Sequence, residues 1–93
     1  ILACDAEDPE GLREIFERHR FGSVLDAAGN CALKACELDP ELARRTNVDG
    51  VRNLLPLVAD FGSRLVHLSI DLVFSGQRAG DYVETDSPDP VTI

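Results

Sequence analysis

The stretch Arg64-Leu65-Val66-His67-Leu68-Ser69-Ile70 (residues 64–70) decides the fold of this chain. A strand formed by these residues would carry apolar side chains on both of its faces. That pattern is typical of a strand that lies between two layers of helices in a parallel sheet. We therefore expect a buried parallel strand over residues 64–70.

A long helix is predicted immediately before that strand. Asp39 is a suitable N-cap, and Pro40 fits the first helical position. Gly62 is a suitable C-terminal cap. Pro56 is a defect in this helix, because an interior proline costs about 3 kcal/mol. The apolar face of the helix consists of Val51, Leu54, Leu55 and Val58.

The first half of the chain shows the same alternation of strands and helices. Residues 1–4 form a short apolar run that we expect to end a strand. Asp8 and Pro9 then mark a helix start, and apolar positions follow at helical spacing. A second strand is predicted over residues 23–28, and a short helical turn over residues 32–38. The helix preceding this second strand has one face made of Leu12, Ile15, Phe16 and His19.

The order strand, helix, strand, helix, strand predicts an α/β fold with a parallel sheet and right-handed crossovers. Ligands of such sheets bind beyond the carboxyl ends of the strands. Three segments are expected there, at residues 5–7, 27–31 and 69–74. Small side chains in and beside two of them would let a ligand approach the backbone. The sequence therefore predicts a ligand site at this edge of the sheet.

The remaining sequence is a loop of acidic character. We expect a turn or loop over residues 75–80 and irregular structure over residues 81–90, where Pro88 and Pro90 occur. The acidic side chains of this region lack the spacing of a calcium loop, so no metal site is predicted.

Composition excludes several classes of protein. The net charge is −8, from nine Lys and Arg against 17 Asp and Glu, so the chain repels phosphate backbones and no nucleic-acid partner is expected. No apolar run approaches the roughly 20 residues that span a bilayer, so no membrane partner is expected. The three cysteines form no CxxC pair, which favours a reducing cytoplasm over a disulfide framework.

Four segments of the chain resemble motifs of the extended short-chain dehydrogenases and reductases. Asp26-Ala27-Ala28-Gly29 resembles the family's "N-A-A" turn, and residues 47–54 (NVDGVRNL) resemble its "N-V-x-G-T-x-N-L" helix. Residues 69–76 (SIDLVFSG) resemble "S-T-D-Y-V-F-D-G", and residues 82–90 resemble "Y-x-E-x-D-x-P-x-P". The third motif points to sugar-nucleotide reductases of the dTDP-4-dehydrorhamnose reductase type.

This resemblance implies a modified Rossmann fold, a doubly wound parallel sheet of which residues 1–93 would be the middle βαβαβ part. It implies binding of NADP or NAD and hydride transfer to a nucleotide-linked 4-keto-6-deoxy sugar, in the cytoplasm, with a homodimer as one assembly. The family's N-terminal glycine-rich turn and its C-terminal Y-x-x-x-K helix do not occur in these 93 residues. We therefore expect the sequence to belong to a longer protein and to be inactive on its own.

The resemblance also implies roles for individual residues. Ser69 would polarise the substrate carbonyl as a catalytic hydroxyl, although Ile70 and Leu72 replace two polar residues of its motif. Asn47 would support the active-site backbone through hydrogen bonds. The predicted cofactor contacts are Asp5, Ala6, Ala27, Ala28, Gly29, Asn47 and Ser69. The predicted substrate contacts are Asn30, Asp71, Leu72, Val73 and Phe74.

Other interpretations of these residues and of the whole chain stay open. Ser69 would otherwise bond backbone at its strand end, Asp71 would cap a turn, and residues 27–29 would serve tight strand–helix packing. His67 is expected to be a buried histidine with satisfied hydrogen bonds. Two alternative functions are a non-catalytic dinucleotide-binding regulatory subunit and an NAD-dependent sugar-nucleotide epimerase or dehydratase.

Overall fold

Two parallel strands form the sheet, β1 (Ser23–Asp26) and β2 (Arg64–His67). The computed structural model describes residues 1–70 and 72–92. Asp26 lies opposite His67 at the end of the ladder, and the Leu68 amide still donates to the Asp26 carbonyl at 3.0 Å. Both strands are shorter than predicted. After β1, the Asp26 side chain accepts a hydrogen bond from the Ala28 amide, and the chain turns out of the ladder.

Helix α1 (Pro9–His19) begins and ends close to where the sequence predicts. The Asp8 side chain caps it by accepting from the Gly11 amide at 3.1 Å. It ends at Arg20, whose φ of 50° is left-handed and whose amide donates to the Phe16 carbonyl. The capping residues thus fix both ends of this helix locally.

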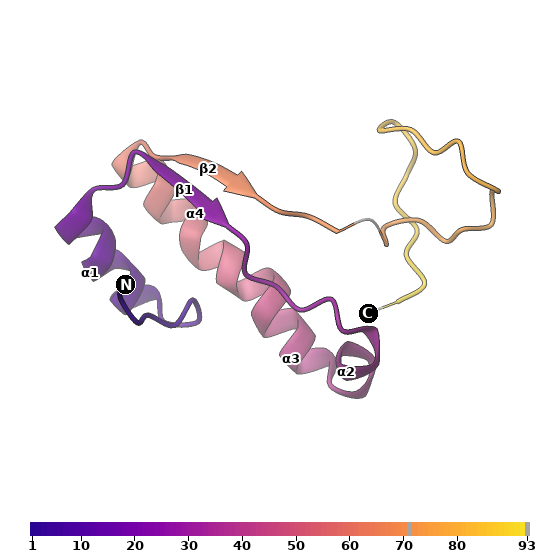
Figure 1. Cartoon of the computed structure of the whole chain (residues 1–93), viewed down its shortest axis with the longest axis horizontal. Coiled ribbons are helices and arrows are strands. Elements are labelled where there is room, and N and C mark those ends of the chain that lie inside the picture. The colour runs from indigo at the N-terminus through magenta and orange to yellow at the C-terminus, as the bar shows by residue number, and fades with distance from the viewer. Residues whose placement is uncertain (71, 93) are drawn as a thin grey trace.

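The crossover from β1 to β2 is helical along most of its length. It consists of α2 (Leu33–Leu38), α3 (Pro40–Arg44), the π-helical segment η1 (Arg45–Asp49) and α4 (Gly50–Phe61). Figure 1 shows α3 and α4 in one long rod that runs beside the strands. The predicted caps are confirmed at Asp39 and at Gly62, whose φ is 65°. The π-helical segment was not predicted.

The core lies between α1, α4 and one face of the sheet. Phe16, Leu54 and Leu57 are its buried residues, and Val24 of β1 packs against them. The Phe16 ring meets Phe21 edge-on, with 5.3 Å between ring centroids. This cluster joins the helical and strand layers, because it contains side chains from both.

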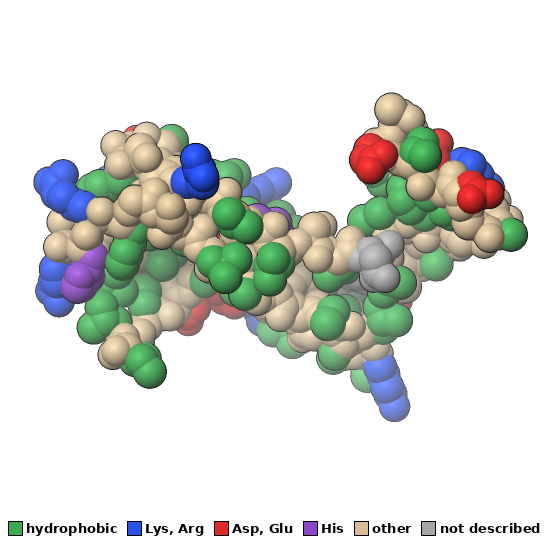
Figure 2. Space-filling model, turned by 45° about the horizontal axis from the view of Figure 1, so that its top comes forward, with side chains coloured by type: hydrophobic (Ala, Val, Ile, Leu, Met, Phe, Trp, Pro, Cys, Tyr) green, Lys and Arg blue, Asp and Glu red, His purple; other side chains and the backbone are tan. Residues whose placement is uncertain are grey.

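Two predictions about strands differ from what these 93 residues show. Residues 1–4 are not part of a strand. Within the described residues, the strand at residues 64–67 is covered on one face: Val66 and its partner Leu25 are 49% and 66% exposed. Both described long helices, α1 and α4, pack with Val24 on the other face. Figure 2 shows apolar side chains at several places on the surface.

Residues 72–92 form an irregular segment, as predicted, and extend away from the helices in Figure 1. Arg78 organises this segment by an ion pair with Asp86 at 2.9 Å and by lying over the Tyr82 ring. Asp89 accepts a hydrogen bond from the Ser75 amide at 2.9 Å. Within residues 1–70 and 72–92, no helix has the length and hydropathy needed to cross a membrane.

Acidification is expected to release Ser75 from Asp89. The hydrogen bond from the Ser75 backbone lowers the pKa of Asp89. A lowered pKa means that the contact stabilises the segment above the ordinary aspartate pKa and is lost as the pH falls through the lowered value. The Ser75 amide chemical shift, followed by NMR against pH in the complete protein, should therefore titrate below the range of an ordinary aspartate. An unchanged titration in the Asp89→Asn variant would contradict this assignment.

Candidate functional site

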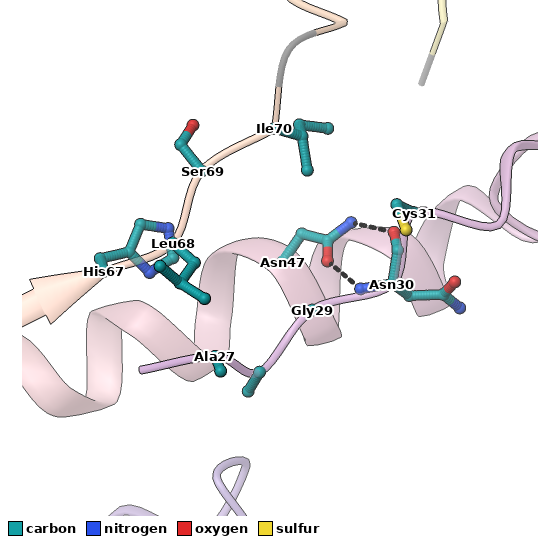
Figure 3. Close-up of a pocket in the computed structure, with 10 residues that line it drawn as sticks. Ala27, Gly29, Asn30, Cys31, Asn47, His67, Leu68, Ser69 and Ile70 are labelled. Carbon is teal, nitrogen blue, oxygen red and sulfur yellow. Dashed lines mark hydrogen bonds between the residues drawn. The ribbon is translucent and has the colours of Figure 1, made fainter. Parts of the chain in front are cut away.

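A cavity of about 300 Å³ opens at the carboxyl ends of β1 and β2. Its walls come from residues 27–31 after β1, from Asn47 of η1, and from residues 67–70 at the end of β2. Figure 3 shows these three segments around the same space. This cavity lies at the edge of the sheet where the sequence predicts a ligand site. We call this cavity the strand-end pocket.

Asn47 holds one wall of the strand-end pocket in place. Its Oδ1 accepts from the Asn30 amide at 2.7 Å, and its Nδ2 donates to the Asn30 carbonyl at 3.0 Å. Figure 3 shows both bonds as dashed lines between the helix and the turn. The Cys36 thiol donates to the same Asn30 carbonyl at 3.4 Å. The predicted support of this backbone by Asn47 is therefore present.

The turn that Asn47 holds carries very small side chains. Ala27, Ala28 and Gly29 line the pocket with at most a methyl group each. A Cβ atom built on Gly29 would lie 3.5 Å from the Asn47 Oδ1, which is ordinary van der Waals contact. A flat group can therefore approach the backbone of residues 27–29 from the pocket, since no long side chain stands in its way.

Asp26 and His67 connect the two strands at the end of the ladder, and His67 lines the pocket. The Asp26 Oδ2 lies 2.8 Å from the His67 Nδ1, and the Asp26 side chain is 5% exposed. His67 is satisfied, as predicted, but it is not buried: its side chain is 37% exposed and lines the pocket. The correction follows from its position at the end of the ladder, where the strands separate.

The structure brings Ala27, Ala28, Gly29, Asn30, Asn47 and Ser69 into the strand-end pocket. The Ser69 hydroxyl points away from the Ala27–Gly29 turn in Figure 3. Ile70 also lines the pocket, although it cannot hydrogen-bond. An apolar side chain thus stands beside the predicted catalytic hydroxyl.

The N-terminal candidates Asp5 and Ala6 do not line this pocket. The Asp5 Oδ1 accepts from the Glu7 amide at 2.9 Å and closes a turn. The Ala6 carbonyl accepts from the Asn53 Nδ2 at 2.8 Å, which ties this loop to α4. Both residues are therefore engaged in the structure of the loop before α1.

Three of the predicted substrate contacts lie in the irregular segment instead. Leu72, Val73 and Phe74 do not line the strand-end pocket, and Phe74 stacks on Tyr82 with 4.3 Å between ring centroids. Asp71 lies outside the described residues. A second cavity of about 240 Å³ in this segment contains none of the predicted site residues.

Sequence reasoning missed His67 and Leu68 as lining residues of the pocket, and Asp26 as the partner of His67. The signal for Asp26 and His67 was a polar residue within each of the two predicted strands, which pair when the register is known. Leu68 carried no signal. The described residues contain no group of three or more His, Cys, Asp or Glu side chains placed to hold a metal ion.

The parallel sheet, the helical crossover and the small-residue turn at the strand ends define a partial Rossmann-like α/β domain. Comparison with known proteins then gives the family. Residues 2–93 match the model of the RmlD substrate binding domain, and the chain belongs to that family. The prediction of fold class and family is confirmed.

Similar proteins cover this chain almost completely. It is 37% identical over 93 residues to dTDP-4-dehydrorhamnose reductase of Burkholderia thailandensis, a match that covers 97% of the chain and 31% of that protein. The structure of dTDP-4-dehydrorhamnose reductase from Bacillus anthracis in complex with NADP matches with a TM-score of 0.89 and 26% identity, over 96% of this chain and 32% of that one. The structure of UDP-glucose 4-epimerase from Thermus thermophilus in complex with NAD matches with a TM-score of 0.84 and 27% identity, over 96% of this chain and 30% of that one. The chain thus spans about a third of these relatives' length.

Proposed function

We propose that residues 1–93 are the middle part of an NAD(P)H-dependent reductase that acts on a nucleotide-linked 4-keto-6-deoxy sugar. One observation carries this proposal: the strand-end pocket combines a small-residue turn, the two hydrogen bonds from Asn47 to the Asn30 backbone, and a hydroxyl at Ser69. The names of the relatives give the substrate class, because two of them are dTDP-4-dehydrorhamnose reductases.

The geometry of the turn fits a nicotinamide dinucleotide. The methyl groups of Ala27 and Ala28 and the bare Gly29 leave the backbone open to a flat ring. Asn47 of η1 bonds both the amide and the carbonyl of Asn30, and these two bonds hold the turn in position where a ligand would lie. The bound dinucleotide supplies the hydride, and the protein's part is to hold and orient the reacting groups.

Within this proposal each part of the pocket has a task. The turn at residues 27–29 provides a surface for the cofactor, and Asn47 keeps that surface in position. Ser69 lies at the end of β2 and donates a hydrogen bond to the substrate carbonyl. Ile70 gives the same wall an apolar side chain.

The complete protein provides the test. Purified protein is mixed with NADPH and a nucleotide-linked 4-keto-6-deoxy sugar, and the loss of reduced nicotinamide is followed by absorbance. We expect turnover that depends on both compounds. Dinucleotide binding without turnover would favour the non-catalytic regulatory subunit instead. Conversion of a nucleotide sugar without net consumption of NADPH would favour the epimerase or dehydratase.

Replacement of Ser69 by alanine is expected to lower kcat of the complete protein about tenfold, because one hydrogen bond to a developing negative charge is lost. Steady-state kinetics measures the effect. Ser69→Thr should retain most of the rate, and Ser23→Ala, at the exposed start of β1, serves as a control. An unchanged kcat in Ser69→Ala would mean that this hydroxyl only bonds backbone.

The cellular location and the assembly belong to the same proposal. Cys4, Cys31 and Cys36 are free thiols, which suits a reducing cytoplasm. The homodimer stays a prediction of the family resemblance, and size-exclusion chromatography of the complete protein tests it.

A further inference from the structure

The Asp26 carboxylate receives two hydrogen bonds on its two separate oxygen atoms. Its Oδ1 accepts from the Ala28 amide at 3.1 Å, and its Oδ2 lies 2.8 Å from the His67 Nδ1. Only 5% of the Asp26 side chain is exposed. The carboxylate is therefore fixed in orientation, because the backbone of the turn holds one oxygen and the next strand holds the other.

This arrangement decides where the proton of a neutral His67 ring lies. An ionised carboxylate accepts hydrogen bonds and donates none, so the Nδ1 must carry the hydrogen. A neutral imidazole has one donor nitrogen and one acceptor nitrogen. The Nε2 of His67 is then an acceptor with a free lone pair.

The ring that carries this lone pair reaches the strand-end pocket. The His67 ring lines the pocket and is 37% exposed. Among residues 1–70 and 72–92, Asp26 is the hydrogen-bond partner of the His67 ring. The lining contains no lysine or arginine, and among the described residues none of its hydroxyl, amide or thiol donors bonds the Nε2. The natural partner of such an acceptor is a donor on the ligand, and hydroxyl groups are the donors that nucleotides and sugars share.

We propose that Asp26 is a positioning residue that holds neutral His67 in the Nδ1–H tautomer, so that its Nε2 accepts a hydrogen bond from a hydroxyl group of the pocket's ligand. The hydrogen bond to a ligand hydroxyl rests on the proposed function. The assignment of the His67 tautomer rests on the geometry of Asp26 alone.

An asparagine in place of Asp26 would invert the tautomer. The Ala28 amide requires an oxygen opposite it, so the amide nitrogen of the new side chain would have to face the His67 ring. That nitrogen carries only hydrogens, and the Nδ1 would become the acceptor. The hydrogen of neutral His67 would then move to the Nε2. The Asp26→Asn change therefore alters the polarity of the pocket without altering its shape.

The tautomer is measured first in the unchanged protein. The complete protein is labelled with ¹⁵N-histidine and studied by NMR at a pH at which His67 is neutral. The His67→Asn variant identifies the signals by their loss. We expect a protonated Nδ1 and an unprotonated Nε2. The opposite pattern would overturn the proposal, and this measurement does not depend on any variant keeping the original contacts.

The Asp26→Asn variant is measured second. We expect the two ring nitrogens of His67 to exchange their roles in this variant. Asp39→Asn is the matched control, because it removes the same charge at the N-cap of α3, where asparagine caps as well as aspartate. The control should keep the original tautomer. An identical pattern in the unchanged protein and in Asp26→Asn would overturn the positioning role.

The ligand is tested with His67→Asn, whose side-chain amide can still donate to Asp26 but has no group at the position of the Nε2. We expect one binding constant to weaken about 5- to 10-fold, as for the loss of one hydrogen bond. A weaker Kd for NADPH alone would assign the hydroxyl to the dinucleotide. An unchanged Kd for NADPH with a raised KM for the nucleotide sugar, at unchanged kcat, would assign it to the substrate.

Two failures are distinguishable. If both constants stay unchanged in an active protein, the hydroxyl contact is overturned while the proposed function stands. If the unchanged protein binds neither NADPH nor the nucleotide sugar, the proposed function and the hydroxyl contact both fail. The NMR measurement then still decides the tautomer.

Discussion

Replacing Asn47 by alanine is expected to destabilise the protein by about 1–3 kcal/mol, because the partly buried Asn30 amide loses its partner and the Asn30 carbonyl keeps only the weak Cys36 thiol donor. The better helix propensity of alanine offsets only about 0.5 kcal/mol of this loss. The turn at residues 27–29 would also lose its support. A displacement of about 1 Å in a substrate-positioning element can lower activity about 10²-fold, and we expect a loss of kcat/KM of that order.

Urea unfolding and steady-state kinetics of the complete protein measure these two effects. Val48→Ala is the matched control: its side chain is the next one along η1, is 40% exposed and should change stability by less than about 0.5 kcal/mol. Asn47→Asp separates the two hydrogen bonds, because a carboxylate still accepts from the Asn30 amide but cannot donate to its carbonyl. Wild-type stability in Asn47→Ala would mean that Asn30 finds other partners.

Replacing Phe16 by alanine is expected to lower the free energy of unfolding by about 3–5 kcal/mol, the usual cost of truncating a buried phenylalanine. The Phe16 side chain is 3% exposed and meets the rings of Phe21 and Phe61. Its loss would leave a cavity where α1, α4 and the sheet meet. Because a domain is stable by only about 5–15 kcal/mol, this one change removes a large part of the total.

Chemical denaturation monitored by circular dichroism measures the change. Phe16→Leu should cost less, since it keeps most of the apolar volume. Leu38→Ala is a control for the loss of an apolar side chain, because Leu38 is 77% exposed. A Phe16→Ala variant as stable as the Leu38→Ala variant would place the core elsewhere.

Much of the site could be predicted from sequence, because its parts are defined by short segments. The small residues of the turn and the unusual Asn47 within a helix are visible in the sequence, and the structure joins them in one pocket. Leu72, Val73 and Phe74 lie outside the strand-end pocket, in the segment organised by Tyr82, Arg78 and Asp89, and their substrate contacts stay predictions. That segment has no apolar periodicity, so the sequence carries little indication of how its side chains pair.

By itself, the sequence determined both ends of α1, the start and end of the long helical rod from Pro40 to Phe61, and the parallel direction of β1 and β2. These properties depend on caps such as Asp8, Asp39 and Gly62 and on apolar patterns, which act within a few residues of one another. Only the tertiary structure decided that Asp26 meets His67, 41 residues along the chain. That contact depends on strand register, which arises from packing between distant segments.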